Sequence, residues 1–368
     1  MITNNLTLNN NEKVIFNLRS LYNKQGYKQY KMSKFEEYDL YVRNKDFLIS
    51  DSVITFTDTN GKLMALKPDV TLSIIKNSKD EPDTIKKVYY DENVYRISKG
   101  TNSFKEITQI GLECIGNIDN YNICEVISLA ANSLKSISDY CVLDVSHLGI
   151  MTALIEALNI PLTATSDVFK YISEKNPHEL LKLCSELGVS LGNAKLFIDV
   201  ATTSGTPKVV LPQLKIMLNS IIDTSIIDEF FDILSNVDDE VKDIINIDFS
   251  VVSDTHYYNN IVFKGFIEGI PASVLSGGQY DKLMKKMKRK SGAIGFAVYL
   301  DMLESLDNNT SNYDVDTVLL YSNTTQLSKI KEQVSSLQSI GQSVYACTKI
   351  PSDLKYKTLM KISECEVD

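Results

Sequence analysis

The segment at residues 53–71 reads VITFTDTNGKLMALKPDVT. It combines a strand pattern and a helix start within a few residues, and the rest of the chain repeats this mixture of strands and helices. Two runs rich in β-formers, Val53–Thr57 and Leu63–Leu66, flank the Asn60-Gly61 pair. Asn and Gly readily adopt the positive φ angles of a tight reversal, so this segment predicts a β-hairpin. Pro68-Asp69 follows directly and predicts the first turn of a helix, where proline is tolerated.

The chain on both sides of this segment alternates between strand and helix patterns. Apolar residues recur at helical spacing from Val14 to Tyr22 and stop at Gly26, which predicts an amphipathic helix ended by glycine. Strands joined mostly through hairpins, with helices between some of them, predict an α+β fold with an antiparallel sheet flanked by helices, rather than a doubly wound parallel sheet. Further strands are expected at Val88–Arg96, Gln109–Ile115, Asp248–Val252, Ile261–Ile267 and Ala293–Ala297, and a further helix at Ile123–Ile137.

The length of the chain predicts two domains, because 368 residues exceed the size at which a single core stops growing. The first is expected over residues 1–310, with a helical insertion at about residues 160–245. The polar stretch Asp307–Asn312 then reads as a linker. Beyond it, residues 311–368 show a strand–helix–strand pattern, which predicts a small C-terminal α/β unit.

Charge and composition narrow the classes of function. With 38 basic and 47 acidic residues the net charge is −9, so the surface as a whole repels nucleic-acid phosphates. The dense basic run at Lys282–Lys290 is interpreted as an exposed surface. Six cysteines without C-x-x-C spacing and three dispersed histidines indicate neither a metal site nor a disulfide framework, and no cofactor is expected.

The distribution of apolar residues predicts a cytoplasmic protein. The first fourteen residues are polar and contain no apolar signal-peptide core. No uninterrupted apolar stretch approaches the length of about 18 residues that a membrane-spanning helix needs. We therefore expect neither secretion nor a membrane anchor.

Four segments, in this order over roughly residues 10–305, resemble the catalytic domain of histidyl-tRNA synthetase, a class II aminoacyl-tRNA synthetase. Each segment would be weak evidence alone, and their number and order make the resemblance specific. They are Ala65–Thr71 (ALKPDVT), Tyr95-Arg96 with Phe104–Glu113 (FKEITQIGLE), His256-Tyr257-Tyr258 leading into Ser276–Leu283 (SGGQYDKL), and Gly292–Asp301 (GAIGFAVYLD).

This resemblance implies a pocket for histidine. Asp69 and Thr71 fall where the family holds the α-ammonium group, and Tyr258 and Tyr280 fall where it grips the imidazole. Taken one at a time, such residues are more often a helix cap, exposed strand residues or core tyrosines, and their joint appearance favours the pocket. The expected histidine-binding residues are Asp69, Thr71, Arg96, Gln109, Glu113, Tyr257, Tyr258, Gly277, Gly278 and Tyr280.

The nucleotide side departs from the family pattern. Ile107 stands where the family has an aromatic residue against the adenine, and Met302 stands where it has the closing arginine. Ser98 and Ser253 likewise replace a glutamate and an arginine. Arg96 survives and is expected to bind an anion, most simply a ligand carboxylate. Removing one placed cation from such a site typically costs about 3 kcal/mol, so adenylation is expected to be lost and no catalytic residue is assigned.

A chain with an amino-acid pocket and without ATP chemistry is similar to the regulatory subunits of short-form ATP phosphoribosyltransferase. That resemblance implies a catalytic partner subunit that performs the first step of histidine biosynthesis, commonly in a hetero-octamer, with L-histidine as a possible allosteric effector. Self-association as a dimer is also implied, although Ser33 replaces a proline of the family's dimer motif. The C-terminal unit resembles only the front of an anticodon-binding domain, so tRNA binding is not expected.

Two other interpretations stay open on the sequence. A divergent histidyl-tRNA synthetase that has re-evolved its ATP contacts would draw on Arg96 and Lys105. A structural protein with no ligand would keep the pocket as a vestige. These two readings differ from the regulatory one in whether the chain catalyses a reaction and whether it binds histidine.

Overall fold

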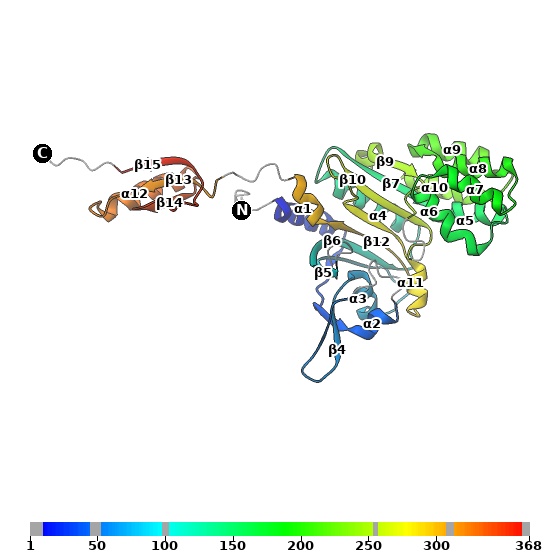
Figure 1. The fold of residues 1–368 in the computed structure, drawn as a ribbon, viewed down its shortest axis with the longest axis horizontal. Coiled ribbons are helices and arrows are strands. Elements are labelled where there is room, and N and C mark those ends of the chain that lie inside the picture. Colours follow the sequence, from blue (N-terminus) through cyan, green and yellow to red (C-terminus); the bar gives the residue numbers. More distant parts are fainter. Residues whose placement is uncertain (1–9, 45–52, 98–102, 253–256, 307–312, 363–368) are drawn as a thin grey trace. The chain divides into compact units, whose positions relative to one another are not determined.

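The computed structural model describes residues 10–44, 53–97, 103–252, 257–306 and 313–362 (Figure 1). The chain divides into two compact units, Met1–Leu306 and Asp307–Asp368. Within the described residues no helix is both long enough and apolar enough to cross a membrane.

A nine-stranded sheet is the centre of the first unit. Its strand order is β1-β5-β6-β12-β11-β10-β7-β9-β8. The β1–β5 and β7–β9 pairs are parallel and the other neighbours are antiparallel, which confirms the predicted α+β sheet. The strands are β1 (Lys28–Gln29), β5 (Lys86–Ile97), β6 (Phe104–Gly116), β7 (Cys141–His147), β8 (Ser204–Gly205), β9 (Ile245–Asp248), β10 (Ile261–Ile267), β11 (Leu275–Gln279) and β12 (Gly292–Tyr299).

The predicted hairpin belongs to a separate three-stranded sheet, in the order β2-β4-β3. This sheet consists of β2 (Phe35–Glu37), β3 (Thr55–Thr57) and β4 (Leu63–Leu66), and β3 and β4 form the hairpin. In Figure 1 the hairpin projects from the body of the unit. The Asp58 carboxylate accepts hydrogen bonds of 2.8 Å from the backbone N–H groups of Asn60 and Lys62, and Gly61 adopts a φ of 79°. The Asn-Gly prediction of a reversal is confirmed.

Helices cover the two faces of the large sheet. α1 (Asn10–Lys24) and α4 (Asn120–Lys135) pack on one face, where the hydroxyls of Tyr22 and Ser133 are hydrogen-bonded at 3.0 Å. A second apolar cluster on the opposite face includes residues of α2 (Tyr38–Val42), α3 (Val70–Asn77) and α11 (Asp281–Lys286). The cavity described below lies on that second face.

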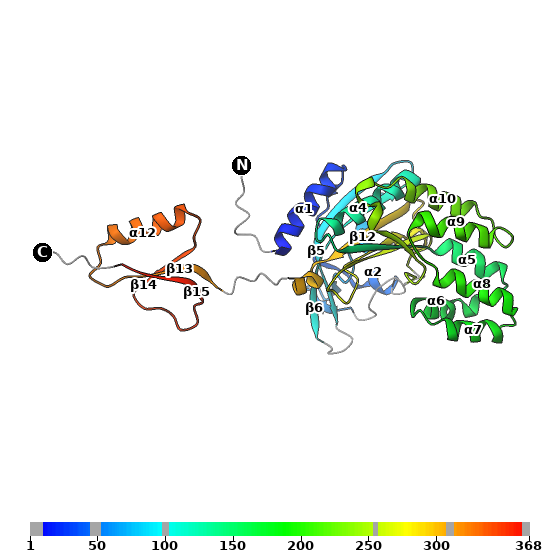
Figure 2. The ribbon, with the colours of Figure 1, turned by 90° about the horizontal axis from the view of Figure 1, so that it is seen from above.

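The helical insertion follows β7 and returns to the sheet at β9. Figures 1 and 2 show its helices grouped at one end of the sheet. Its core contains apolar side chains from each of the six α-helices, among them Leu154, Phe197 and Phe230. The elements are α5 (Leu148–Ala157), η2 (Leu162–Ala164), α6 (Thr165–Ser173), α7 (Pro177–Glu186), α8 (Leu191–Thr202), α9 (Pro207–Leu218), α10 (Ser225–Ser235) and η3 (Asp239–Ile244).

The second unit has a three-stranded parallel sheet in the order β14-β13-β15. The strands are β13 (Val315–Leu320), β14 (Val344–Cys347) and β15 (Tyr356–Lys361), with α12 (Leu327–Ser339) between the first two. The expected strand–helix–strand pattern is confirmed, and β15 adds a strand that the sequence did not indicate.

One predicted strand was placed wrongly. The sequence favoured a strand at Asp248–Val252, whereas β9 ends at Asp248. The Asp248 carboxylate accepts a hydrogen bond from the Ser250 N–H at 2.8 Å, and this side-chain turn stops the strand. The apolar pair Val251-Val252 is buried without belonging to the sheet.

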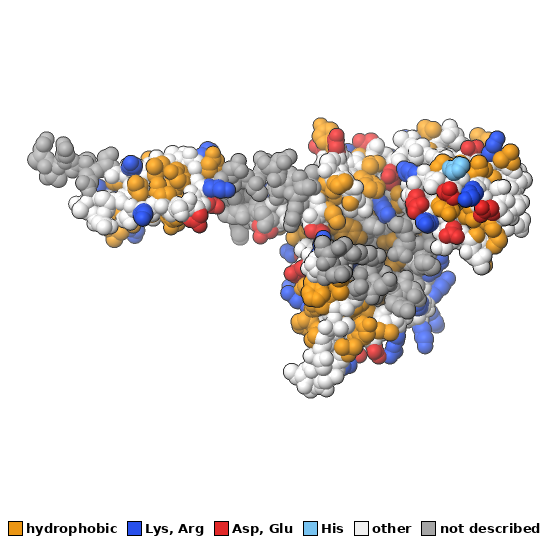
Figure 3. Space-filling view, in the orientation of Figure 1, with side chains coloured by type: hydrophobic (Ala, Val, Ile, Leu, Met, Phe, Trp, Pro, Cys, Tyr) orange, Lys and Arg blue, Asp and Glu red, His pale blue; other side chains and the backbone are white. Residues whose placement is uncertain are grey.

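The basic run around α11 lies on the surface, as the sequence indicated. Its lysines are exposed, and Lys and Arg side chains gather over this helix in Figure 3. The Arg289 guanidinium donates to the carbonyls of Ile75 and Lys76, at the end of α3, and so fixes the segment to the body of the unit.

Candidate functional site

A cavity of about 300 Å³ lies between the second face of the large sheet and the start of α3. Registers across the sheet explain the hollow, because residues directly opposite one another on neighbouring strands point to the same side. Gly111, Ala297 and Ser276 are opposite one another on β6, β12 and β11, and Lys264 of β10 follows in the same row. The Tyr90 hydroxyl covers Gly111, where an added Cβ would be 2.6 Å from it, so the small residues Ala297 and Ser276 are the ones that leave a trough beside Lys264.

Glu113 is the central acid of the cavity. The Thr71 hydroxyl donates to its Oε1 at 2.7 Å, and the Tyr280 hydroxyl donates to its Oε2 at 2.5 Å. Burial raises the pKa of this carboxyl to about 8, although both hydroxyl hydrogen bonds act to lower it, while the nearby Asp69 charge adds to the rise. Glu113 therefore keeps its proton near neutral pH until a cation or a further donor arrives.

Room for Glu113 depends on a glycine of the neighbouring strand. Gly295 lies opposite Glu113, and a Cβ built on Gly295 would be 1.9 Å from Glu113 Oε2. No side chain fits there while the carboxylate keeps its place. Glycine at this position thus lets the acid lie flat across β12 toward Tyr280.

Asp69 has two roles in the structure. Its carboxylate accepts the Leu72 N–H at 2.8 Å and so caps the N-terminus of α3, which is the structural role that the sequence left open. The same side chain also lines the cavity. Burial raises its pKa, opposed by the cap hydrogen bond and by the charge of Arg96. Asp69 therefore both caps α3 and forms part of the cavity wall.

Five tyrosines surround these acids. Tyr257 contacts Tyr258 with ring centroids 4.7 Å apart and Tyr280 at 5.7 Å. Burial raises the pKa of all five phenols, so each remains a neutral hydrogen-bonding group. They offer aromatic faces and hydroxyl groups to a small polar ligand. The five are Tyr90, Tyr257, Tyr258, Tyr280 and Tyr299.

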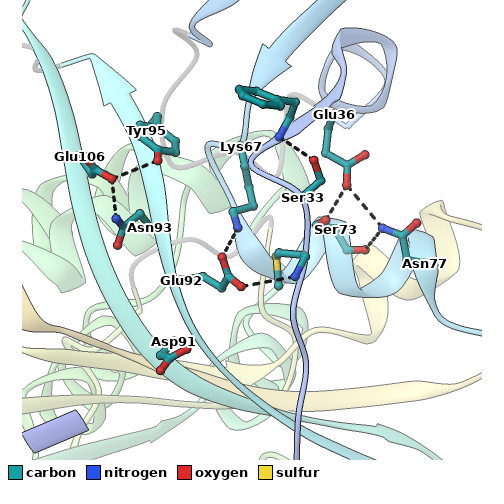
Figure 4. Close-up of polar contacts among 12 residues, drawn as sticks. Ser33, Glu36, Lys67, Ser73, Asn77, Asp91, Glu92, Asn93, Tyr95 and Glu106 are labelled. Carbon is teal, nitrogen blue, oxygen red and sulfur yellow. Dashed lines mark hydrogen bonds and ion pairs between the residues drawn. The ribbon is translucent and has the colours of Figure 1, made fainter. Parts of the chain in front are cut away.

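Buried polar contacts hold the segment that carries Asp69 (Figure 4). Lys67, just after β4, is fully buried, and its ammonium donates to Glu92 of β5 at 2.9 Å. Its carbonyl accepts the Tyr95 N–H at 2.9 Å. On the same side of the cavity, Arg96 donates to the carbonyl of Pro68 at 3.1 Å. The backbone from Lys67 to Asp69 is thereby tied to β5.

The structure brings together eight of the ten residues expected around histidine. Gly278 lies behind Tyr258, since a Cβ there would be 2.8 Å from the Tyr258 ring. Gly277 faces the other side of the sheet, where a Cβ would meet Phe263 and Phe296, so it does not line the cavity. The eight are Asp69, Thr71, Arg96, Gln109, Glu113, Tyr257, Tyr258 and Tyr280.

Several cavity residues were missed by the sequence, among them Tyr90, Lys264, Ser273, Ser276 and Tyr299. Ser276 and Tyr299 lie in segments that carry the family resemblance. Tyr90, Lys264 and Ser273 lie outside those segments and had no signal of their own.

On the nucleotide side, two of the four substituted positions are described. Ile107 is partly buried and packs against the second apolar cluster, and Met302 is 39% exposed. Neither carries charge or an aromatic ring. Ser98 and Ser253 lie outside the described residues.

Comparisons with known proteins agree with this fold. A family model described as histidyl-tRNA synthetase matches residues 6–303. The chain is 26% identical, over 80% of its length and 73% of the relative's, to the ATP phosphoribosyltransferase regulatory subunit of Oceanobacillus iheyensis. It is 28% identical to that of Caldanaerobacter subterraneus subsp. tengcongensis, over 77% and 75% of the two chains.

Solved structures show the same likeness. An ATP phosphoribosyltransferase regulatory subunit/histidyl-tRNA synthetase from Bacillus halodurans C has a TM-score of 0.78 at 20% identity, covering 96% of this chain and 93% of that one. An ATP phosphoribosyl transferase complex from Thermotoga maritima has a TM-score of 0.61 at 18% identity, covering 78% and 96%. The match over residues 6–303 settles the classification: this chain belongs to the histidyl-tRNA synthetase family.

Proposed function

We propose that the chain is a non-catalytic regulatory subunit of ATP phosphoribosyltransferase, the enzyme of the first step of histidine biosynthesis. The observation that carries the proposal is the cavity of about 300 Å³ around Glu113, in a chain whose curated relatives bear that name. The reaction itself takes place on a separate catalytic subunit. A cytoplasmic location is part of the proposal.

The ligand of the cavity is L-histidine in this account. A cavity of about 300 Å³ holds a free amino acid, and its lining combines two buried acids with five phenols. The acids and hydroxyls suit the ammonium and imidazole N–H groups, which are all donors. The proposed binding residues are the eight that line the cavity, with Gly278 supporting Tyr258.

Loss of adenylation is the second part of the proposal. Phosphoryl chemistry rests on several placed cations and on a platform for the adenine. Ile107 and Met302, at the family's positions for an aromatic residue and an arginine, provide neither. We therefore assign the chain no catalytic residue and no tRNA-charging activity.

Feedback inhibition by histidine requires that histidine binding and the activity of the assembly be thermodynamically linked. Histidine inhibits the assembly only if it binds more tightly to the less active state, with a coupling free energy of typically 1 to 3 kcal/mol. The proposed assembly contains the catalytic subunit and this chain as a hetero-octamer, in which the chain also forms a dimer with itself. The Thermotoga maritima complex is a structural precedent for a related fold in such an enzyme.

Reconstitution tests the role directly. A short catalytic subunit from the same organism is assayed with ATP and phosphoribosyl pyrophosphate, with and without this chain. The proposal predicts that the chain raises the activity severalfold or more and that histidine then lowers it. An activity that is the same with and without the chain would contradict the regulatory role.

The competing function is a divergent histidyl-tRNA synthetase, which the family membership itself favours. Histidine-dependent exchange of pyrophosphate with ATP separates the two. The regulatory account predicts exchange at background level for the chain alone. Exchange above background would assign the cavity to aminoacylation instead.

A further inference from the structure

A second hollow, here termed the lysine hollow, has a volume of about 230 Å³ and lies where β6 ends and β12 begins. Gly116, the last residue of β6, is opposite Gly292, the first residue of β12, and both glycines line it. None of the residues around this hollow lines the cavity around Glu113. The polar side chains in its wall are Asn117, Gln279, Asp281, Lys285, Lys290 and Ser291.

Positive charge prevails in the wall of the lysine hollow. Lys285 of α11 and Lys290 of the loop after it each bring an ammonium group, and no described residue forms an ion pair with either of them. Asp281 is the acid among the described lining residues, and its two oxygens already accept hydrogen bonds of 3.0 Å, from the Ala293 N–H and from the Asn259 amide. The lining thus has two cations against one carboxylate, in a chain whose net charge is −9.

Gln279 adds a buried hydrogen-bond donor to this wall. The residue is only 7% exposed, and its Oε1 accepts the Ile261 N–H at 3.1 Å. Because a backbone N–H can only donate, this bond fixes the amide oxygen toward Ile261 and leaves the amide NH2 group for the hollow. No described residue accepts a hydrogen bond from that nitrogen. Buried donors are normally satisfied, so this group calls for an acceptor that enters the hollow.

The loop that carries the second lysine is held in place by backbone contacts. The chain reverses after α11, where Lys288 has a φ of 59° and the Arg289 N–H donates to the Met284 carbonyl at 2.9 Å. The Asp80 carboxylate then accepts the N–H of Lys290 at 2.9 Å. The backbone of the loop is therefore ordered before any ligand arrives, which lowers the entropic cost of binding.

We propose that the lysine hollow binds the phosphate group of a small anion, whether free phosphate, pyrophosphate or the phosphates of a nucleotide. Phosphate oxygens accept hydrogen bonds, and the hollow offers them two ammonium groups and an amide NH2 group. A phosphate group carries about two negative charges at neutral pH, so it balances both lysines, whereas a carboxylate balances only one. The site is separate from the amino-acid cavity, and the inference does not depend on the proposed function.

Isothermal titration calorimetry of the full chain at low ionic strength tests the site with inorganic phosphate, pyrophosphate and metal-free ATP. The wild-type chain is expected to bind pyrophosphate. In Lys285→Met and in Lys290→Met the affinity is expected to fall about tenfold or more, because each variant loses a charge-assisted hydrogen bond. Gln279→Glu keeps the acceptor for Ile261 and replaces the donor with a carboxylate oxygen, so its loss is expected to be at least as large.

The three probes distinguish the source of the phosphate group. Equal affinities for all three would assign the hollow to a single phosphate group. Equal affinities for pyrophosphate and ATP, with weaker binding of inorganic phosphate, would assign it to two linked phosphates. ATP binding without pyrophosphate binding would show that the nucleoside is recognised, and it would overturn the assignment to phosphate.

Lys288→Met is the matched control. Lys288 is exposed and belongs to the same basic run, but it does not line the hollow, so this variant is expected to bind pyrophosphate as the wild type does. Thermal unfolding of each variant shows whether the fold is kept. Histidine affinity is measured alongside and is expected to be unchanged in Lys290→Met, since the two sites share no residue.

Three results would overturn the inference. The first is a wild-type chain that binds none of the three anions. The second is an equal loss of affinity in Lys288→Met and in the two hollow variants, because binding would then follow the charge of the whole run and not this site. The third is a loss of histidine affinity in Lys290→Met, which would contradict the separation of the two sites. A wild-type chain that binds pyrophosphate and not histidine would contradict the proposed function alone.

Discussion

The Tyr280 hydroxyl donates a 2.5 Å hydrogen bond to Glu113, and this bond joins the residue that follows β11 to the C-terminal part of β6. Thr71 of α3 donates to the other oxygen of the same carboxylate. One buried acid therefore ties together three segments that are far apart in the sequence. Because those segments form the cavity wall, we expect the protonation of Glu113 to affect both histidine binding and the stability of the fold.

Replacing this acid should weaken histidine binding. Glu113→Gln keeps the size of the side chain but cannot ionise when a cationic ligand arrives, so the affinity for histidine is expected to fall at least about tenfold. Calorimetry measures the change, with Glu186→Gln on the exposed face of α7 as the matched control. Equal affinities in the two variants would show that Glu113 does not bind the ligand.

The same acid should make the stability of the ligand-free chain depend on pH. The pKa of Glu113 is about 8 in the folded chain and 4.5 as its ordinary value, so between these values the folded state holds a proton that the unfolded state releases. The free energy of unfolding therefore falls as the pH rises, by up to about 1.4 kcal/mol per unit.

At lower pH, the titration of His147 changes the free energy of unfolding in the opposite direction, so the pH range of the measurement has to lie above the pKa of free histidine. Burial lowers the pKa of His147 to about 4 from 6.5, so it adds stability as the pH rises to 6.5. Between pH 6.5 and 8 the contribution of His147 changes little, and the difference between wild type and Glu113→Gln in urea unfolding reports Glu113, because other shifted groups such as Asp69 are common to both chains. Wild type should lose stability over this range more steeply than Glu113→Gln, and parallel profiles would contradict the raised pKa.

The sequence predicted the parts of the fold that local chemistry determines. The reversal at Asn60-Gly61 needs a positive φ and could be read from a few residues. A helix after Pro68-Asp69 was also predicted, but it begins at Val70 with Asp69 as its cap, so Pro68 precedes the helix and does not lie in its first turn. The strand end at Asp248 was missed because apolar Val251 and Val252 suggested that the strand continues. The hydrogen bond from the Ser250 N–H to the Asp248 carboxylate instead turns the chain, and the two valines are buried outside the sheet. Local patterns fix which elements form and leave their exact ends open.

The site was partly predictable for a related reason. Asp69, Glu113 and Tyr280 occur in recognisable motifs, and the structure brings them together. Lys264 reaches the cavity only through the register of β10 against β11, a pairing between distant segments that no short pattern encodes. The face to which Gly277 belongs likewise depends on register, because neighbouring strand residues point to opposite sides.

A glycine substitution tests the close approach at the cavity. Gly295→Ala would place a methyl group 1.9 Å from Glu113 Oε2 and 2.4 Å from the Leu112 carbonyl, so neither neighbour can stay in place. We expect a loss of about 1 to 3 kcal/mol in the free energy of unfolding, together with weaker histidine binding. Urea unfolding and calorimetry measure the two effects.

Gly192→Ala is the matched control for that variant. Gly192 lies in α8, where an added Cβ meets nothing within 4 Å, so the change should be neutral or stabilising by up to about 1 kcal/mol. If Gly295→Ala proved as stable as Gly192→Ala and bound histidine normally, the described packing of Glu113 against β12 would be wrong.

The buried ion pair beside the cavity should also be measurable. Lys67→Met leaves Glu92, only 16% exposed, without its partner, and is expected to cost about 3 kcal/mol. The double variant Lys67→Met with Glu92→Gln should be less destabilised, since no uncompensated charge remains. Lys62→Met breaks an exposed pair with Glu37 of β2, in the same three-stranded sheet, and should leave the free energy of unfolding nearly unchanged. Equal losses for the two lysines would contradict the burial of Lys67.

The most direct test of the account is the histidine dose–response of the reconstituted enzyme. A catalytic subunit is assembled with either the wild-type chain or Glu113→Gln, and ATP phosphoribosyltransferase activity is measured as histidine is added. The account predicts inhibition with the wild-type chain and a half-inhibitory concentration at least about tenfold higher with Glu113→Gln, because feedback acts through this cavity. Identical inhibition curves for the two assemblies would contradict it, since histidine would then act at another site.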